Sequence, residues 1–159
     1  MDFHPHEYQS IAIQRIIDNT HYGLLLDMGL GKTISTLVAI ERLMYDYFDI
    51  KKVLLIAPKK VAESTWAQES QKWSATRRLT VAKVLGSEKE RIHALESESD
   101  VYVINRENVQ WLYEYYHKKK SFPFDMLVID ESSSFKNPQA KRFKAIRKLR
   151  PLFKRIVIL

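Results

Sequence analysis

The chain has 159 residues, 45% of them hydrophobic and 28% charged, a balance typical of one folded globular domain and not of a disordered chain. It contains no cysteine, which excludes disulfides and thiolate metal sites and agrees with a reducing compartment. No apolar run approaches the roughly 18 residues that a membrane span needs, and no secretory signal opens the chain. We therefore expect a cytoplasmic protein, in a bacterium or a viral host cell, or a nuclear one, and not a secreted one.

The formal net charge of +7 is concentrated at one end of the chain. Residues Ser132 to Leu159 contain nine Lys and Arg and no acid, whereas the other 131 residues contain 17 basic and 19 acidic side chains. A basic block of this kind can attract a phosphate backbone or can form a solvated helix face, and the solvated face is the favoured interpretation.

Short apolar runs alternate with longer helical patterns along the whole chain. The strands are predicted at Tyr22–Asp27, Val53–Ala57, Leu79–Leu85, Val101–Asn105, Met126–Asp130 and Arg155–Leu159, and the helices at about 6–19, 32–48, 60–73, 87–96, 106–119 and 138–150. Consecutive apolar positions indicate strands covered on both faces, and the alternation predicts a mainly parallel sheet with helices on both sides. Without a repeat or a linker, residues 1–159 are expected to form one α/β domain.

A phosphate-binding loop is predicted between the first strand and the second helix. The segment Met28-Gly29-Leu30-Gly31-Lys32-Thr33 follows the strand residues Leu24–Asp27. Its glycines allow a tight turn whose amides converge on phosphates, Lys32 supplies positive charge, and the Thr33 hydroxyl can ligate magnesium. The usual first glycine is absent, because Leu26 stands there. A turn with a surface lysine is the alternative, but the strand before and the helix after favour the phosphate loop.

An acidic pair follows the fifth predicted strand. Asp130 can hold the magnesium shell and Glu131 can orient the attacking water as a general base. Such a pair also occurs at strand ends simply because it is solvated there. Its place about 100 residues after the phosphate loop favours the catalytic interpretation.

These motifs resemble the Swi/Snf branch of the superfamily-two helicases. The resemblance is carried by Gly29–Thr33, by Asp-Glu-x-x-x-x-Lys-Asn at Asp130–Asn137, by Pro58 with the pair Trp66 and Trp73, and by Tyr8-Gln9. It implies the first RecA-like lobe of a DNA-dependent ATPase, a three-layer P-loop NTPase fold that uses ATP and Mg²⁺. The sequence departs from the family at Ser132-Ser133, where Ala-His is common, which puts the coupling of nucleotide to DNA in question.

The resemblance also implies roles for residues outside the two motifs. Tyr8 and Gln9 match the segment that selects adenine, and a carboxamide can pair with the N7 and N6 positions of that base. The positions of Lys59, Lys60 and Arg106, just after strands, match motifs that touch the DNA backbone, although solvated charge is the commoner role of such residues.

The sequence therefore predicts the motor lobe of a helicase or of a duplex DNA translocase. A small-molecule P-loop kinase and a nucleotide-gated DNA-binding module without hydrolysis are the alternatives. Because Arg155–Leu159 has the pattern of a core strand, we expect the chain to be part of a longer protein. A second RecA-like lobe would then supply an arginine finger, and the isolated chain is expected to bind ATP but hydrolyse it very slowly.

Overall fold

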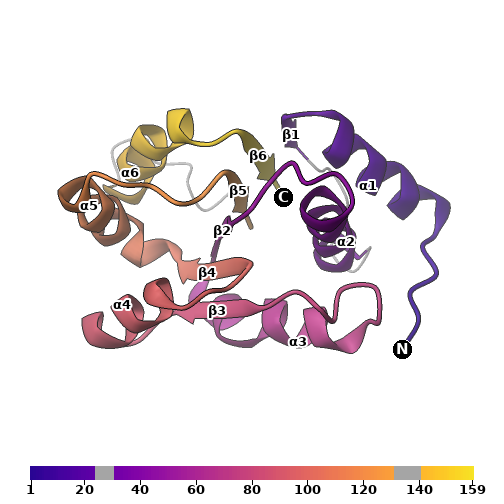
Figure 1. The fold of residues 1–159 in the computed structure, drawn as a ribbon, viewed down its shortest axis with the longest axis horizontal. Helices are drawn as coiled ribbons and strands as arrows, with labels where there is room; N and C mark the ends of the chain where they lie inside the picture. The colour runs from indigo at the N-terminus through magenta and orange to yellow at the C-terminus, as the bar shows by residue number, and fades with distance from the viewer. Residues whose placement is uncertain (24–30, 131–140) are drawn as a thin grey trace.

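The computed structural model describes residues 1–23, 31–130 and 141–159, which form a sheet with helices on both faces (Figure 1). Its strands are β1 (His21–Gly23), β2 (Val53–Ala57), β3 (Val81–Val84), β4 (Val101–Asn105), β5 (Met126–Ile129) and β6 (Arg155–Ile158). They lie in the order β1-β6-β5-β2-β4-β3, and every neighbouring pair is parallel. The predicted α/β fold class is confirmed.

In the residues that the structure describes, six α-helices cover the two faces of the sheet, with short helical turns between some of them. The helices are α1 (Glu7–Asp18), α2 (Lys32–Tyr45), α3 (Trp66–Lys72), α4 (Glu88–Glu96), α5 (Val109–Lys119) and α6 (Lys141–Leu149). A π-helical turn, η1 (Val61–Thr65), precedes α3, and 3₁₀ turns occur at η2 (Arg106–Asn108) and η4 (Arg150–Leu152). The predicted helices at 60–73 and 106–119 therefore each begin with a turn of different geometry. Within the described part of the chain, no helix is long and apolar enough to cross a membrane.

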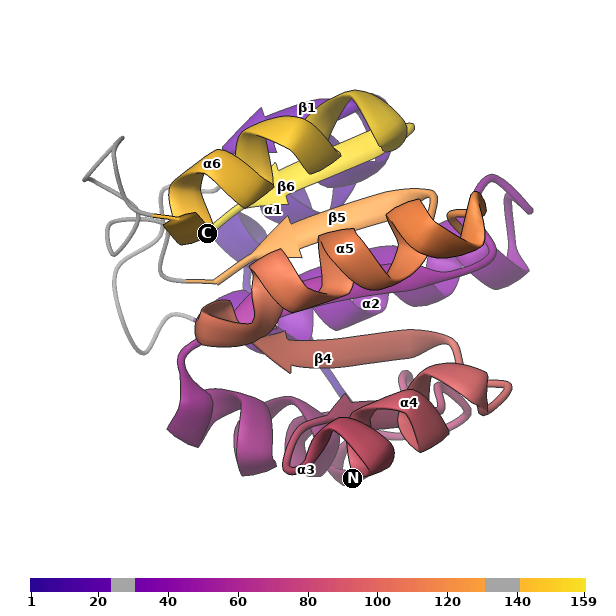
Figure 2. The ribbon, with the colours of Figure 1, turned by 90° about the vertical axis from the view of Figure 1, so that its left-hand side faces the viewer.

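Successive residues of the central strands pack alternately into two hydrophobic cores, one on each face of the sheet. Val53, Leu55 and Ala57 of β2 point into a core built with α1, α2 and α3, whereas Leu54 and Ile56 point into a core built with α4, α5 and α6. Figure 2 shows the second set of helices in front of the strands and α1 and α2 behind them. Burial on both faces explains why these strands are apolar at consecutive positions.

Because all the strands are parallel, their carboxyl ends lie together at one edge of the sheet. In open sheets of this type, ligands bind just outside that edge, where the loops after the strands meet. Strands β1, β2, β4 and β5 all end at this edge, and residues that the sequence singled out follow each of them along the chain.

Candidate functional site

The predicted phosphate loop precedes α2 in the sequence, and the structure describes its residues from Gly31 onward. Gly31 is the N-cap of α2 and has a φ of +75°, a backbone conformation that favours glycine. Lys32 and Thr33 are the first two residues of the helix, and both side chains are half-buried. The first amides of a helix have no partner within it, so they can bind an anion. Met28, Gly29 and Leu30 lie outside the described residues.

Gln9 of α1 lies directly against Gly31. A Cβ atom placed on Gly31 would sit 2.1 Å from Gln9 Nε2, so the two residues leave no room for a side chain at position 31. Gln9 is only 6% exposed, and its Oε1 accepts a hydrogen bond from the backbone N–H of His6 at 2.9 Å. Tyr8 is partly exposed, and its ring stacks on that of His6 with centroids 5.5 Å apart. Of the two residues predicted to face adenine, Gln9 therefore lies against the N-cap of α2, and Tyr8 stacks on His6.

Asp130 follows β5 directly, and its contacts include two hydrogen bonds to other parts of the chain. Its backbone N–H donates to the carbonyl of Ile56 in β2 at 2.7 Å, and its Oδ2 accepts a hydrogen bond from the indole Nε1–H of Trp66 at 3.0 Å. The sequence marked Trp66 only as part of the family resemblance and did not assign it this contact. Glu131 lies outside the described residues, as do Ser132 and Ser133.

The residues predicted to contact DNA lie after β2 and β4. Lys59 and Lys60 are exposed, and Lys59 lines a polar cleft of about 870 Å³ together with Lys83 of β3 and Asn105 of β4. Arg106 is half-buried, and its Nε and Nη1 have no hydrogen-bond partner among the described residues. An Oε1 of Glu107 lies 3.6 Å from that Nε. The cleft thus carries both signs of charge, because Glu63, Glu90 and Glu107 line it as well.

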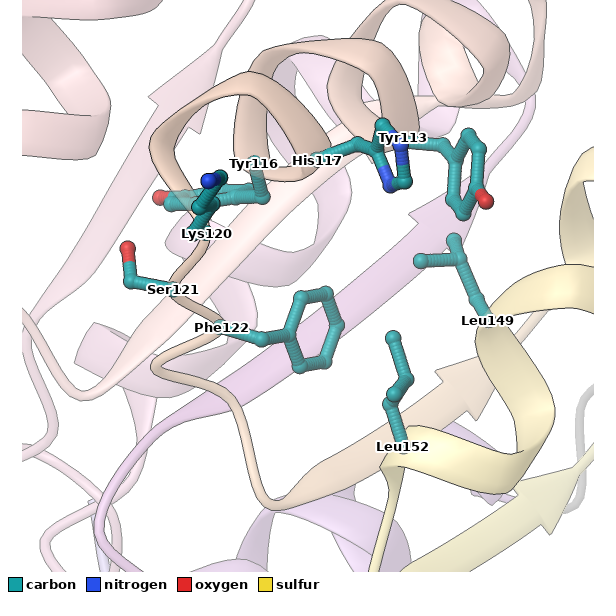
Figure 3. Close-up of a pocket in the computed structure, with 8 residues that line it drawn as sticks. All are labelled: Tyr113, Tyr116, His117, Lys120, Ser121, Phe122, Leu149 and Leu152. Atoms are coloured by element: carbon teal, nitrogen blue, oxygen red, sulfur yellow. The ribbon is translucent and has the colours of Figure 1, made fainter.

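A second, more apolar pocket of about 360 Å³ lies between α5 and α6, near the start of β5 (Figure 3). Leu149 and Phe122 form part of its wall, and Tyr113, His117 and the half-exposed Leu152 also line it. It opens at the edge of the sheet opposite to Gly31 and Asp130, because α5 ends there and β5 begins there. None of the predicted site residues that the structure describes lines it.

Comparison with known proteins finds one family and several relatives that match most of the chain. The sequence profile of the SNF2-related domain matches residues 8–158. Protein p41 of Acyrthosiphon pisum secondary endosymbiont phage 1 is 36% identical over 136 residues, covering 85% of this chain and 29% of that relative. The nuclear protein STH1/NPS1 of Saccharomyces cerevisiae is 32% identical over 143 residues, covering 85% of this chain and 10% of that relative. The chain thus spans less than a third of the curated relatives it matches.

Solved structures show the same fold at lower sequence identity. The Sulfolobus solfataricus SWI2/SNF2 ATPase core in complex with dsDNA superposes with a TM-score of 0.79 at 23% identity, covering all of this chain and 32% of that one. The UvsW helicase from bacteriophage T4 gives a TM-score of 0.74 at 18% identity, covering 99% of this chain and 52% of that one. The chain therefore shares the three-layer, RecA-like α/β fold of these two structures. Since the family profile spans nearly the whole sequence, the chain belongs to the SNF2-related domain family.

Proposed function

We propose that this chain is the ATP-binding motor lobe of a DNA-dependent ATPase, either a helicase or a translocase on duplex DNA. The observation that carries the proposal is the meeting of Gly31, at a left-handed φ before α2, with Gln9 from α1. This contact brings the segment predicted to select adenine against the segment predicted to bind phosphate. Both belong to a chain of the SNF2-related family, which supports one nucleotide site built from the two segments.

The residues of this edge fit a magnesium nucleotide. The first turn of α2 offers backbone N–H groups and the Lys32 ammonium to phosphate oxygens. The Thr33 hydroxyl and the Asp130 carboxylate are oxygen ligands of the kind that magnesium prefers. Magnesium, when bound, offsets negative charge on the phosphates during their transfer. Glu131 is proposed as the general base that orients water, and Gln9 with Tyr8 as the adenine contact.

DNA is proposed to run along the loops after β2 and β4. Lys59 and Lys60 are exposed there, and the half-buried Arg106 follows β4 at the same edge of the sheet, which supports contacts to phosphate oxygens. Contacts of this kind position the backbone but carry no sequence information. Binding is therefore expected to be indifferent to sequence.

Hydrolysis is proposed to need a second RecA-like lobe. The chain spans only 32% of the Sulfolobus solfataricus SWI2/SNF2 core and 29% of the phage protein p41. An arginine supplied to the γ-phosphate is worth roughly 10³–10⁵ in rate in related phosphoryl-transfer enzymes. Without such an arginine, Lys32 and magnesium alone offset the developing charge, so the isolated chain should bind ATP and turn it over very slowly.

The test compares ATPase rates of this chain with those of a longer polypeptide in which a second RecA-like lobe is joined to it. DNA-stimulated phosphate release in the longer protein, abolished by Glu131→Gln while ATP still binds, is the expected result. Turnover that requires a small-molecule acceptor would instead identify a kinase. ATP binding and DNA binding with no turnover in either protein would identify a binding module. Equal rates for the two polypeptides would refute the need for a second lobe.

A further inference from the structure

The indole of Trp66 is buried beside the carboxylate that is proposed to hold magnesium. Trp66 has no exposed surface, and its Nε1–H lies 3.0 Å from Oδ2 of Asp130, 64 residues further along the chain. An indole N–H can only donate, and a buried donor without an acceptor is costly. The Asp130 carboxylate therefore satisfies a donor that would otherwise be buried at a cost.

Two hydrogen bonds tie Asp130 to the β2 strand and to the helical segment that follows it. The backbone N–H of Asp130 bonds to Ile56 within β2, and the side chain bonds to Trp66 at the start of α3. Trp66 in turn packs in the core formed by α1, α2 and α3. The orientation of the carboxylate is thus coupled to the packing of α3 and not to its own strand alone.

The turn before Trp66 has unusual geometry. Residues Val61–Thr65 form a π-helical turn, and α3 begins at Trp66 itself. A π turn contains more residues than an α turn, so it rotates the side chains that follow relative to a continuous α-helix. Such turns are frequent at functional sites. Here the turn immediately precedes the residue that contacts Asp130, whereas the sequence predicted a continuous helix.

The chemical character of the donor suits a metal ligand. A carboxylate has about four acceptor positions, of which the indole N–H occupies one. The donor is uncharged, so it orients the carboxylate without itself neutralising the negative charge. An arginine or lysine at the same place would hold the carboxylate equally well but would compete electrostatically with magnesium.

We propose that Trp66 is a positioning residue that orients the Asp130 carboxylate for Mg²⁺ and thereby sets the magnesium dependence of ATP binding. The inference rests on the proposed function, because it takes Asp130 as the magnesium carboxylate. Loss of the partner that orients a metal ligand typically lowers metal affinity by 10–100-fold. The effect should appear in the part of ATP affinity that magnesium contributes, and not in the binding of ATP alone.

The first experiment is calorimetric titration of ATP into the chain with Mg²⁺ and, separately, with EDTA. Trp66→Phe should reduce the affinity gain caused by Mg²⁺ by about tenfold and leave the affinity measured in EDTA unchanged. Trp73→Phe is the matched control, because the Trp73 indole donates to Glu69 at 3.0 Å and not to Asp130. In an Asp130→Asn background, Trp66→Phe should cause no further change in the gain of ATP affinity that Mg²⁺ produces.

The outcomes separate this inference from the proposed function. If magnesium does not strengthen ATP binding to the wild-type chain, the magnesium site itself is refuted. If the wild type shows the gain and a folded Trp66→Phe variant shows the same gain, the positioning role of Trp66 is refuted and the site stands.

A second measurement does not depend on the folding of Trp66→Phe. The chain has three tryptophans, so an indole ¹H–¹⁵N spectrum contains three Nε1–H signals, and Trp73→Phe and Trp111→Phe identify the Trp66 signal by elimination. Adding Mg²⁺ to the ATP-bound chain should shift the Trp66 signal more than the other two. A Trp66 signal that stays in place while magnesium binds would overturn the proposal.

Discussion

The amide nitrogen of Gln9 occupies the space that a side chain at Gly31 would need. An added Cβ on Gly31 would lie 2.1 Å from Gln9 Nε2 and 3.3 Å from a methyl carbon of Ile34, and the φ of +75° is itself unfavourable for other residues. Glycine at position 31 therefore satisfies two demands at once. It accepts the left-handed backbone, and it lets α1 approach the first turn of α2.

Gly31→Ala should weaken ATP binding by disturbing both the loop backbone and the position of Gln9. The expected loss is about tenfold or more in affinity, since strain of this kind costs on the order of 1–3 kcal/mol. Gly23→Ala is the matched control, because a Cβ there would meet nothing within 4 Å. Calorimetric titration of ATP into the wild type and both variants measures the effect. A folded Gly31→Ala variant that binds ATP as tightly as the wild type would contradict the prediction.

Lys32→Ala should weaken ATP binding without unfolding the chain, because the half-buried side chain stands at the first position of α2. Loss of a charge-assisted bond worth roughly 1.5–3 kcal/mol corresponds to about a 10–100-fold fall in affinity. Lys118→Ala is the control, because Lys118 is exposed and lies in the last turn of α5, at the other edge of the sheet. Unchanged ATP affinity in a folded Lys32→Ala variant would remove the phosphate-loop assignment.

Gln9→Ala should narrow the preference for ATP over GTP and leave the magnesium dependence intact. The carboxamide offers a donor and an acceptor that suit adenine, whereas guanine presents two acceptors at the corresponding edge. Because Gln9 Oε1 also accepts the His6 N–H, Gln9→Glu should keep that bond and lose the amide donor. Competition titrations with both nucleotides measure the effect, and equal binding of ATP and GTP by the wild type would refute base selection.

Binding of DNA to this chain should be weak and should fall steeply as salt rises. Each phosphate contact releases counterions, so Lys59→Ala and Lys60→Ala should each reduce the slope of log affinity against log salt by about 1. Lys118→Ala should leave the slope unchanged, because Lys118 lies at the other edge of the sheet. Fluorescence anisotropy over a salt series, repeated with two unrelated duplexes, provides the measurement. Tight binding at high salt, or a clear sequence preference, would contradict a backbone-only contact.

Asp49→Asn should lower the free energy of unfolding by about 1–3 kcal/mol at neutral pH, the usual range for charge-assisted hydrogen bonds. Lys154 donates to Oδ1 of Asp49 at 2.6 Å, and Arg155 donates to Oδ2 and also to the carbonyl of Ile16 at the end of α1. The variant would leave Arg155 without its acid. Asp46→Asn, an exposed neighbour without an ion pair among the described residues, is the control.

The contacts of Asp49 with Lys154 and Arg155 also predict how the stability of the fold depends on pH. The hydrogen bond from Lys154, followed by the hydrogen bond and the charge of Arg155, holds the pKa of Asp49 below its ordinary 3.8, although partial burial acts in the opposite direction. A lowered pKa means that this stabilisation is fully present above pH 3.8 and is lost as the pH falls through the folded-state pKa. Urea unfolding at several pH values should show the wild type and Asp49→Asn converging in acid. If the two proteins still differ in free energy of unfolding by the same amount below the folded-state pKa of Asp49, the stabilising role of its ionised carboxylate is contradicted.

Local sequence patterns determined most of the secondary structure of this protein. The strands at Val53–Ala57 and Val101–Asn105 have their predicted bounds, because strands buried on both faces are apolar at every position and end where polarity returns. The confirmed fold class and the confirmed resemblance to the Swi/Snf branch rest on the same local signals, namely strand–helix alternation and short motifs of fixed spacing. The roles of the individual site residues remain predictions, and Glu131 lies outside the described residues.

Only the tertiary structure decided which distant residues meet. The insertion of β6 between β1 and β5 depends on pairing of backbones far apart in the chain, which no local pattern specifies. The contact of Gln9 with Gly31 requires the packing of α1 on α2, and the bond from Trp66 to Asp130 spans 64 residues and follows a π turn that apolar periodicity did not distinguish from an α-helix. Periodicity records which face of an element is buried, whereas the partner on that face is chosen by the sum of all packing and hydrogen-bonding contacts in the folded chain.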